Sequence, residues 1–120
     1  MQRYFKPQEF RCRCDRGEKC DATQMDIETV MKLEGLRREL GEAMVITSAE
    51  RCPYWNDKVG GSSTSYHLRG RAVDVQVKNG QHAGRILLLA VKHGFTGIGV
   101  SAGGFLHLDT REFPLTVFGY

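Results

Sequence analysis

The sequence predicts an α+β fold, in which a small antiparallel sheet packs with two main helices. Two segments, residues 26–40 and 81–93, carry apolar residues at helical spacing. Short apolar segments separated by turns predict strands, and their close spacing favours hairpin-like connections. The order is helix, strand, strand, helix, strand, strand. Because single domains cluster near this length of 120 residues, we expect one domain over residues 1–120.

The first helix is predicted over residues 26–40. Asp26 is a favourable N-cap, and Glu28 suits the positive end of the helix dipole. Gly41 follows and is typical of the residue that ends a helix. Its apolar residues fall near one face: Ile27, Val30, Met31, Leu36 and Leu40. The preceding residues 1–23 lack periodicity, which predicts irregular structure.

The first two strands flank a long polar loop. Residues 43–47 form a short apolar run, and residues 71–77 alternate, with Asp74 on the face opposite the valines. The polar stretch 49–66 lies between them, and loops of that length in compact domains are usually functional. The remaining predicted elements are a helix and a hairpin, at residues 81–93, 97–100 and 105–109.

Composition excludes several classes of protein. Hydrophobic residues make up 41% and charged residues 26%, which is typical of a globular protein and not of a disordered one. No apolar run is long enough for stable membrane insertion. The net charge of +3 is too small for a nucleic-acid partner but suits an anionic polymer. Nucleotide-binding glycine motifs and the G-x-S-x-G motif of serine hydrolases are absent.

Three residues stand out as potential metal ligands: His67, Asp74 and His107. A carboxylate in a valine-rich strand is costly to bury unless it is paired or bound to a metal. A turn at Gly70 can bring His67 onto Asp74, and His107 lies in another predicted strand. Two nitrogens, one oxygen and an open fourth position make a catalytic zinc site. The residues alone leave open that the histidines are structural, or that Asp74 is an edge residue or a salt-bridge partner.

Residues 65–74, with the sequence SYHLRGRAVD, fit the pattern S-x-H-x-x-G-x-A-x-D in full. This stretch resembles the signature of the D-Ala-D-Ala carboxypeptidase-like zinc peptidases, a family of peptidoglycan hydrolases. The resemblance covers residues 8–111 and implies the hedgehog/D-Ala-D-Ala-peptidase-like fold. Further stretches resemble the family's S-G-Y-R-x-P, N-x-x-V-G-G, G-I-G-V and F-x-H-x-D-x-R elements, at residues 48–53, 56–61, 97–100 and 105–111.

The resemblance implies one catalytic Zn²⁺, with His67, Asp74 and His107 as its ligands. Arg51 matches an arginine that contacts the substrate carbonyl or stabilises the oxyanion, and Ser65 matches a serine that contacts substrate. The implied activity is hydrolysis of an amide bond in the peptide stem of peptidoglycan, by a D,D-carboxypeptidase or an endopeptidase.

The general base departs from the family's pattern. Several family members place Glu or Asp three residues before the last histidine, where this chain has Gly104. Asp109 shares a strand face with His107 and is the predicted substitute; equally, it could accept a hydrogen bond from a ligand or from Arg51. Glu50 is a weaker candidate. Without a base, the domain would be a zinc-binding but catalytically impaired module.

The sequence contains four cysteines: Cys12, Cys14, Cys20 and Cys52. With no signal peptide expected, a reducing compartment predicts free thiols. A structural zinc and one disulfide remain open alternatives. Small size and one catalytic domain suit a phage endolysin, which we expect to be a monomer in the host cytoplasm before release to the cell wall.

Overall fold

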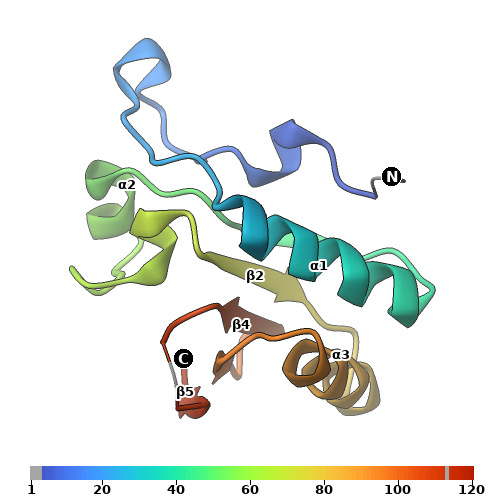
Figure 1. Cartoon of the computed structure of the whole chain (residues 1–120). Helices are drawn as coiled ribbons and strands as arrows, with labels where there is room; N and C mark the ends of the chain where they lie inside the picture. The colour runs from blue at the N-terminus through green and yellow to red at the C-terminus, as the bar shows by residue number, and fades with distance from the viewer. Residues whose placement is uncertain (1–3, 113) are drawn as a thin grey trace.

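The computed structural model describes residues 4–112 and 114–120 and has an α+β fold (Figure 1). One five-stranded sheet has the order β1-β2-β4-β3-β5. Pairing is antiparallel except between β3 and β5, which run parallel. The predicted fold class is therefore confirmed, with one parallel pair added. The strands are β1 (Ile46–Ser48), β2 (Ala72–Gln76), β3 (Gly97–Val100), β4 (Phe105–Asp109) and β5 (Thr116–Gly119).

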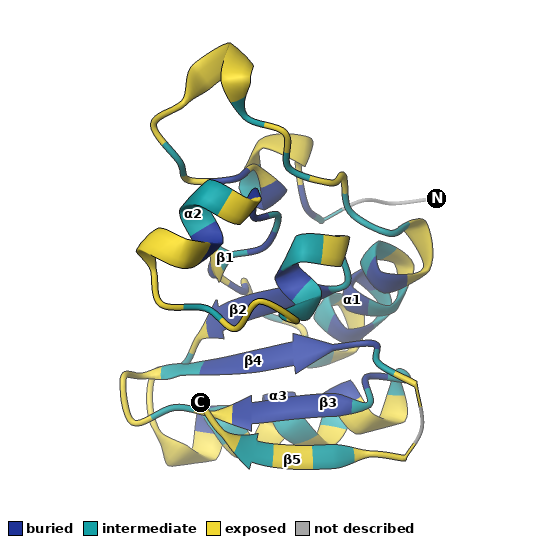
Figure 2. Ribbon diagram, turned by 90° about the vertical axis from the view of Figure 1, so that its left-hand side faces the viewer, coloured by how far each residue is buried: buried dark blue, intermediate teal, exposed yellow. Residues whose placement is uncertain are grey.

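Two main helices, α1 (Ile27–Leu40) and α3 (Gly80–Lys92), cover one face of the sheet, and Figure 2 shows the opposite face. The ends of α1 follow the sequence: Asp26 accepts a hydrogen bond from the Thr29 amide at 3.0 Å, and Gly41 adopts φ 76°. None of the helices in the described part of the chain is long and apolar enough to cross a membrane.

The hydrophobic core fills the space between the two helices and the sheet. Val73 and Val75 of β2 are buried in it, while Asp74 points to the opposite face, as the alternation predicts. The polar side of the sheet is thus free to carry a site. Other fully buried core residues are Leu33, Leu36, Ile86, Ala90, Ile98 and Leu108.

One α-helix and one strand of the described chain were not predicted from the sequence. Helix α2 (Pro53–Lys58) lies inside the polar loop, and its six residues are too few to show a helical period. Strand β5 has one apolar side chain on each face: Val117 is 57% exposed, whereas Phe118 faces the polar side of the sheet. A strand at a sheet edge with this pattern gives no clear alternation of apolar and polar residues.

Gly70 ends a short 3₁₀ helix, Tyr66–Arg69, with a left-handed φ of 68°, and a Cβ there would collide with the Gln24 carbonyl oxygen. We predict that Gly70→Ala costs more stability than Gly41→Ala, whose Cβ would meet no atom within 4 Å. Gly41→Ala should cost about 1–2 kcal/mol through backbone strain, and Gly70→Ala about 1–3 kcal/mol more through the collision. Urea unfolding measures both. Equal losses would show that the contact with Gln24 imposes no constraint.

Candidate metal centre

Strand pairing places two of the three predicted ligands side by side. Asp74 of β2 is the direct register partner of His107 in β4, so both side chains leave the same face of the sheet. His67 comes from the 3₁₀ helix that precedes β2. Ser65 caps the start of this helix, where its hydroxyl accepts a hydrogen bond from the His67 amide at 3.2 Å, and Gly70 caps the end. The turn at Gly70 therefore returns His67 to Asp74, as the sequence predicts.

The three side chains converge on one point. His67 Nε2 and His107 Nδ1 each lie 3.1 Å from Asp74 Oδ1, and the three ligand atoms lie within 4.8 Å of one another. Ligand atoms about 2.0–2.2 Å from a tetrahedral zinc are about 3.3 Å apart. The spacing and the donor set of two nitrogens and one oxygen therefore both fit zinc.

The second nitrogen of each histidine ring is also held. His67 Nδ1 donates to the Ala49 carbonyl at 2.8 Å, and His107 Nε2 lies 2.7 Å from Asp109 Oδ2. Such partners fix the orientation of a metal-binding histidine and leave its other nitrogen for the metal. In this site the remaining nitrogens are His67 Nε2 and His107 Nδ1, which both face Asp74. The residues present therefore fit a zinc ion.

Burial and hydrogen bonding set the charges of the centre. Burial disfavours ionised Asp74, but its side-chain contacts with His107 and His67 outweigh the burial and lower its pKa to about 2. Burial of Asp109 is outweighed by bonds from Arg111 and His107, so its pKa lies well below the usual range. Burial lowers the pKa of His67. Burial opposes charge on His107 too, yet bonds to Asp109 and Asp74 raise its pKa. Asp74 is thus held in its ionised form, which is the form in which a carboxylate binds a metal ion.

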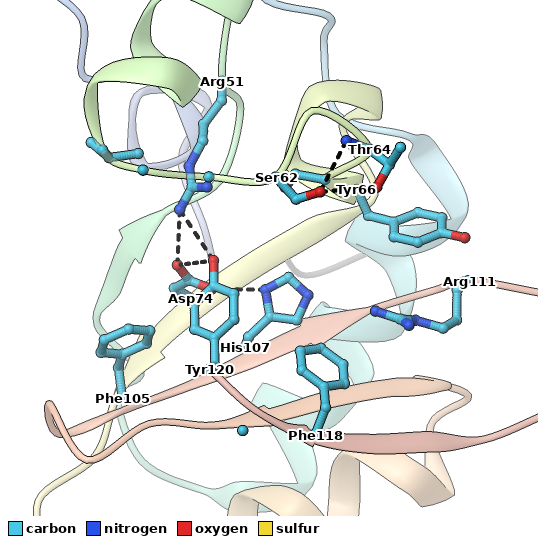
Figure 3. A pocket seen from close by; sticks show the side chains of 15 residues that line it. Arg51, Ser62, Thr64, Tyr66, Asp74, Phe105, His107, Arg111, Phe118 and Tyr120 are labelled. Atoms are coloured by element: carbon cyan, nitrogen blue, oxygen red, sulfur yellow. Dashed lines mark hydrogen bonds and ion pairs between the residues drawn. The ribbon is translucent and has the colours of Figure 1, made fainter.

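The second oxygen of Asp74 faces two donors, Arg51 and Tyr120 (Figure 3). Arg51 Nη2 and the Tyr120 hydroxyl each lie 3.3 Å from Asp74 Oδ2 and 3.3 Å from one another. Arg51 is only 6% exposed and also bonds to Ser48 and Asn56. Asp74 therefore offers one oxygen to the metal position, while the other is held by these two donors.

A cavity of about 730 Å³ opens over the centre. Asp74 and His107 form part of its lining, whereas His67 is fully buried beneath them. Arg51 and Ser65, both predicted to contact substrate, also line it. Phe118 and Tyr120 also line the cavity and were not predicted from the sequence. They reach it through the pairing of β5 with β3, which no local pattern of residues signals. Other lining residues are Val59, Gly60, Gly61, Ser62, Thr64, Tyr66, Phe105, Arg111 and Gly119.

Neither candidate for the general base, Asp109 or Glu50, lines this cavity. Asp109 is fully buried, contacts His107 and Arg111, and is not part of the cavity lining. Glu50 lines a different cavity, together with Phe5 and neighbouring residues. Among the described residues, Asp74 is the one carboxylate that lines the cavity over the metal centre.

Two histidines and a carboxylate beside an open cavity are the donor set typical of the catalytic zinc site of metallopeptidases. The chain belongs to the peptidase M15 family, because the family model described as Peptidase M15 matches residues 3–109. The match contains the whole metal centre as well as Arg51 and Ser65. A comparison with curated proteins found no match. The family is zinc-dependent and D-Ala-D-Ala carboxypeptidase-like, as the sequence motifs imply.

Because Asp109 accepts a hydrogen bond from His107, we predict that Asp109→Asn weakens zinc affinity by about 10–100-fold. Competition with a zinc chelator measures the affinity, and added zinc should restore peptidase activity. The control is Glu28→Gln, an equivalent change on the exposed side of α1, which should leave the affinity unchanged.

A general base at Asp109 would behave differently. In that case Asp109→Asn would keep wild-type zinc affinity and lose about 10²–10⁴-fold in turnover, with no recovery on adding zinc. That result would contradict a positioning role.

Proposed function

We propose that the protein hydrolyses an amide bond in the peptide stem of bacterial peptidoglycan, as a D,D-carboxypeptidase or an endopeptidase. The proposal rests on one observation. His67, Asp74 and His107 are arranged to hold a metal ion, and Asp74 and His107 line a cavity of about 730 Å³. A volume of this order accommodates a short peptide segment. Zinc, when bound, lowers the pKa of a water molecule and polarises a carbonyl group.

Arg51 and Tyr120 are the donors placed to bind the carbonyl oxygen of the scissile bond. Both line the cavity beside Asp74, and the Arg51 Nη2 and Tyr120 hydroxyl atoms are 3.3 Å apart. Fixed donors of this kind stabilise negative charge that develops on an oxygen during amide hydrolysis. Contacts of Arg51 with Ser48 and Asn56 hold the guanidinium in place before substrate arrives.

The residues that line the cavity favour an anionic peptide as substrate. Arg111 is one of these residues, with its guanidinium stacked 5.0 Å from the ring of Tyr66 and 4.8 Å from that of Phe118. The hydroxyls of Ser62 and Thr64 add groups that can bond to peptide amides. Stem peptides carry carboxylates, and the chain has a net charge of +3, so the charges are complementary.

A second candidate function is a zinc-binding module that binds peptidoglycan without cutting it. It is favoured by one observation: among the described residues, the cavity lining offers no carboxylate besides the ligand Asp74. A general base typically contributes about 10²–10⁴-fold to such a reaction, so its absence from the lining would leave turnover low.

Mass spectrometry of muropeptides distinguishes the two functions. Zinc-loaded protein is incubated with purified sacculi and with soluble muropeptides, and the products are compared with those of His107→Ala. The proposal expects new amino termini in the wild-type digest alone, and the product masses identify the bond. Zinc-loaded wild-type protein that binds sacculi but yields no product would instead support the binding module.

We predict that Arg51→Ala lowers kcat by roughly 10²-fold or more, as the loss of an oxyanion donor does. Zinc content should be unchanged, because Arg51 contacts the Asp74 oxygen that faces away from the metal position. Steady-state kinetics on muropeptides and metal analysis check both expectations. Arg38→Ala, on the exposed side of α1, is the control. Wild-type kcat for Arg51→Ala would limit Arg51 to anchoring its loop.

A further inference from the structure

The four cysteines form a cluster and all precede residues 65–74, the motif that carries His67 and Asp74. Cys12, Cys14 and Cys20 belong to the irregular segment that precedes α1, and Cys52 is the N-cap of α2. The irregular segment lies next to α2 in Figures 1 and 2. All four sulfurs lie within 4.8 Å of one another, although up to 40 residues separate them in the sequence, and none forms a disulfide.

Sulfur spacing in the cluster matches a tetrahedral metal site. The sulfurs of Cys12 and Cys52 are 3.8 Å apart. Four sulfurs at the usual zinc–sulfur distance of about 2.3 Å lie about 3.8 Å from one another. A disulfide would instead hold two sulfurs about 2.05 Å apart.

Backbone amides point at the sulfurs. The Cys52 amide donates to the Cys12 sulfur at 3.4 Å, and the Trp55 amide donates to the Cys52 sulfur at 3.4 Å. Hydrogen bonds of this kind stabilise thiolates, which are the form of cysteine that binds metals.

The segment around the cluster has few other contacts that would hold it. Between Arg11 and Met25 its regular structure is one short 3₁₀ helix, Gly17–Lys19, and most of its side chains are exposed. Ordering such a chain costs conformational entropy that little apolar burial offsets here. A metal cross-link to Cys52 would supply the missing stabilisation.

We propose that Cys12, Cys14, Cys20 and Cys52 bind a second zinc ion, which has a structural role. Four thiolates close the coordination sphere and leave no position for substrate, in contrast to the open site over Asp74. The proposal does not depend on the peptidase activity. Its structural consequence is local: Cys52 follows Arg51, whose amide bonds to the His67 carbonyl at 3.3 Å, so the cross-link would hold the loop that carries Arg51.

Metal analysis of purified protein tests the proposal. Wild-type protein should hold two zinc ions per chain, and the double variant His67→Ala/His107→Ala should hold one. Cys14→Ser/Cys20→Ser, which changes the two half-buried cysteines, should also hold one. Glu18→Gln, in the same exposed segment, is the control and should keep two. One zinc in the wild type, with none lost in the cysteine variant, would overturn the proposal.

Cobalt substitution gives a test that does not depend on the cysteine variant folding. Cobalt-loaded wild-type and His67→Ala/His107→Ala proteins should both show thiolate-to-cobalt charge-transfer absorption, because the four sulfurs are present in each. Wild-type protein without this absorption, or an intact mass that shows disulfides in freshly purified protein, would refute the site. Absorption without any peptidase activity would leave this proposal standing and count against the proposed function alone.

Discussion

The buried carboxylate of Asp74 is the interaction on which the site depends. It is 3% exposed in the middle of a valine-rich strand, where a charge is costly unless every oxygen is paired. One oxygen faces His67 and His107, and the other faces Arg51 and Tyr120. These four partners come from four different parts of the chain. The positions of the polar loop, the 3₁₀ helix, β4 and β5 are therefore all coupled to one side chain.

The parts of the site that local sequence determines could be predicted. The alternation of β2 separates Asp74 from the valines, and a glycine turn returns His67 to it. Tyr120 could not be predicted in this way, because it reaches the site through the parallel pairing of β5 with β3. The role of Asp109 depends on packing too: Gly97 on the neighbouring strand lacks a Cβ that would collide with its carboxylate. That space lets Asp109 turn to His107 and away from the cavity.

The cysteine cluster shows the same limit of sequence patterns. Cys12 and Cys14 lie 38 or more residues from Cys52, and their spacing matches no standard zinc motif. Only the fold brings the four sulfurs together. In the account proposed here, the open site over Asp74 would carry the chemistry, and the closed cysteine site would hold the loop that contains Arg51. Because Arg51 and Cys52 are adjacent, the structural site and the catalytic site share one short segment.

The central claim is that His67, Asp74 and His107 bind zinc. Anomalous diffraction at the zinc absorption edge, from crystals of the purified protein, tests it most directly. The account predicts a strong peak bounded by His67 Nε2, His107 Nδ1 and Asp74 Oδ1, with Asp109 hydrogen-bonded to the other nitrogen of His107. A peak coordinated by Asp109, or no peak between these three ligands in zinc-loaded protein, would contradict it.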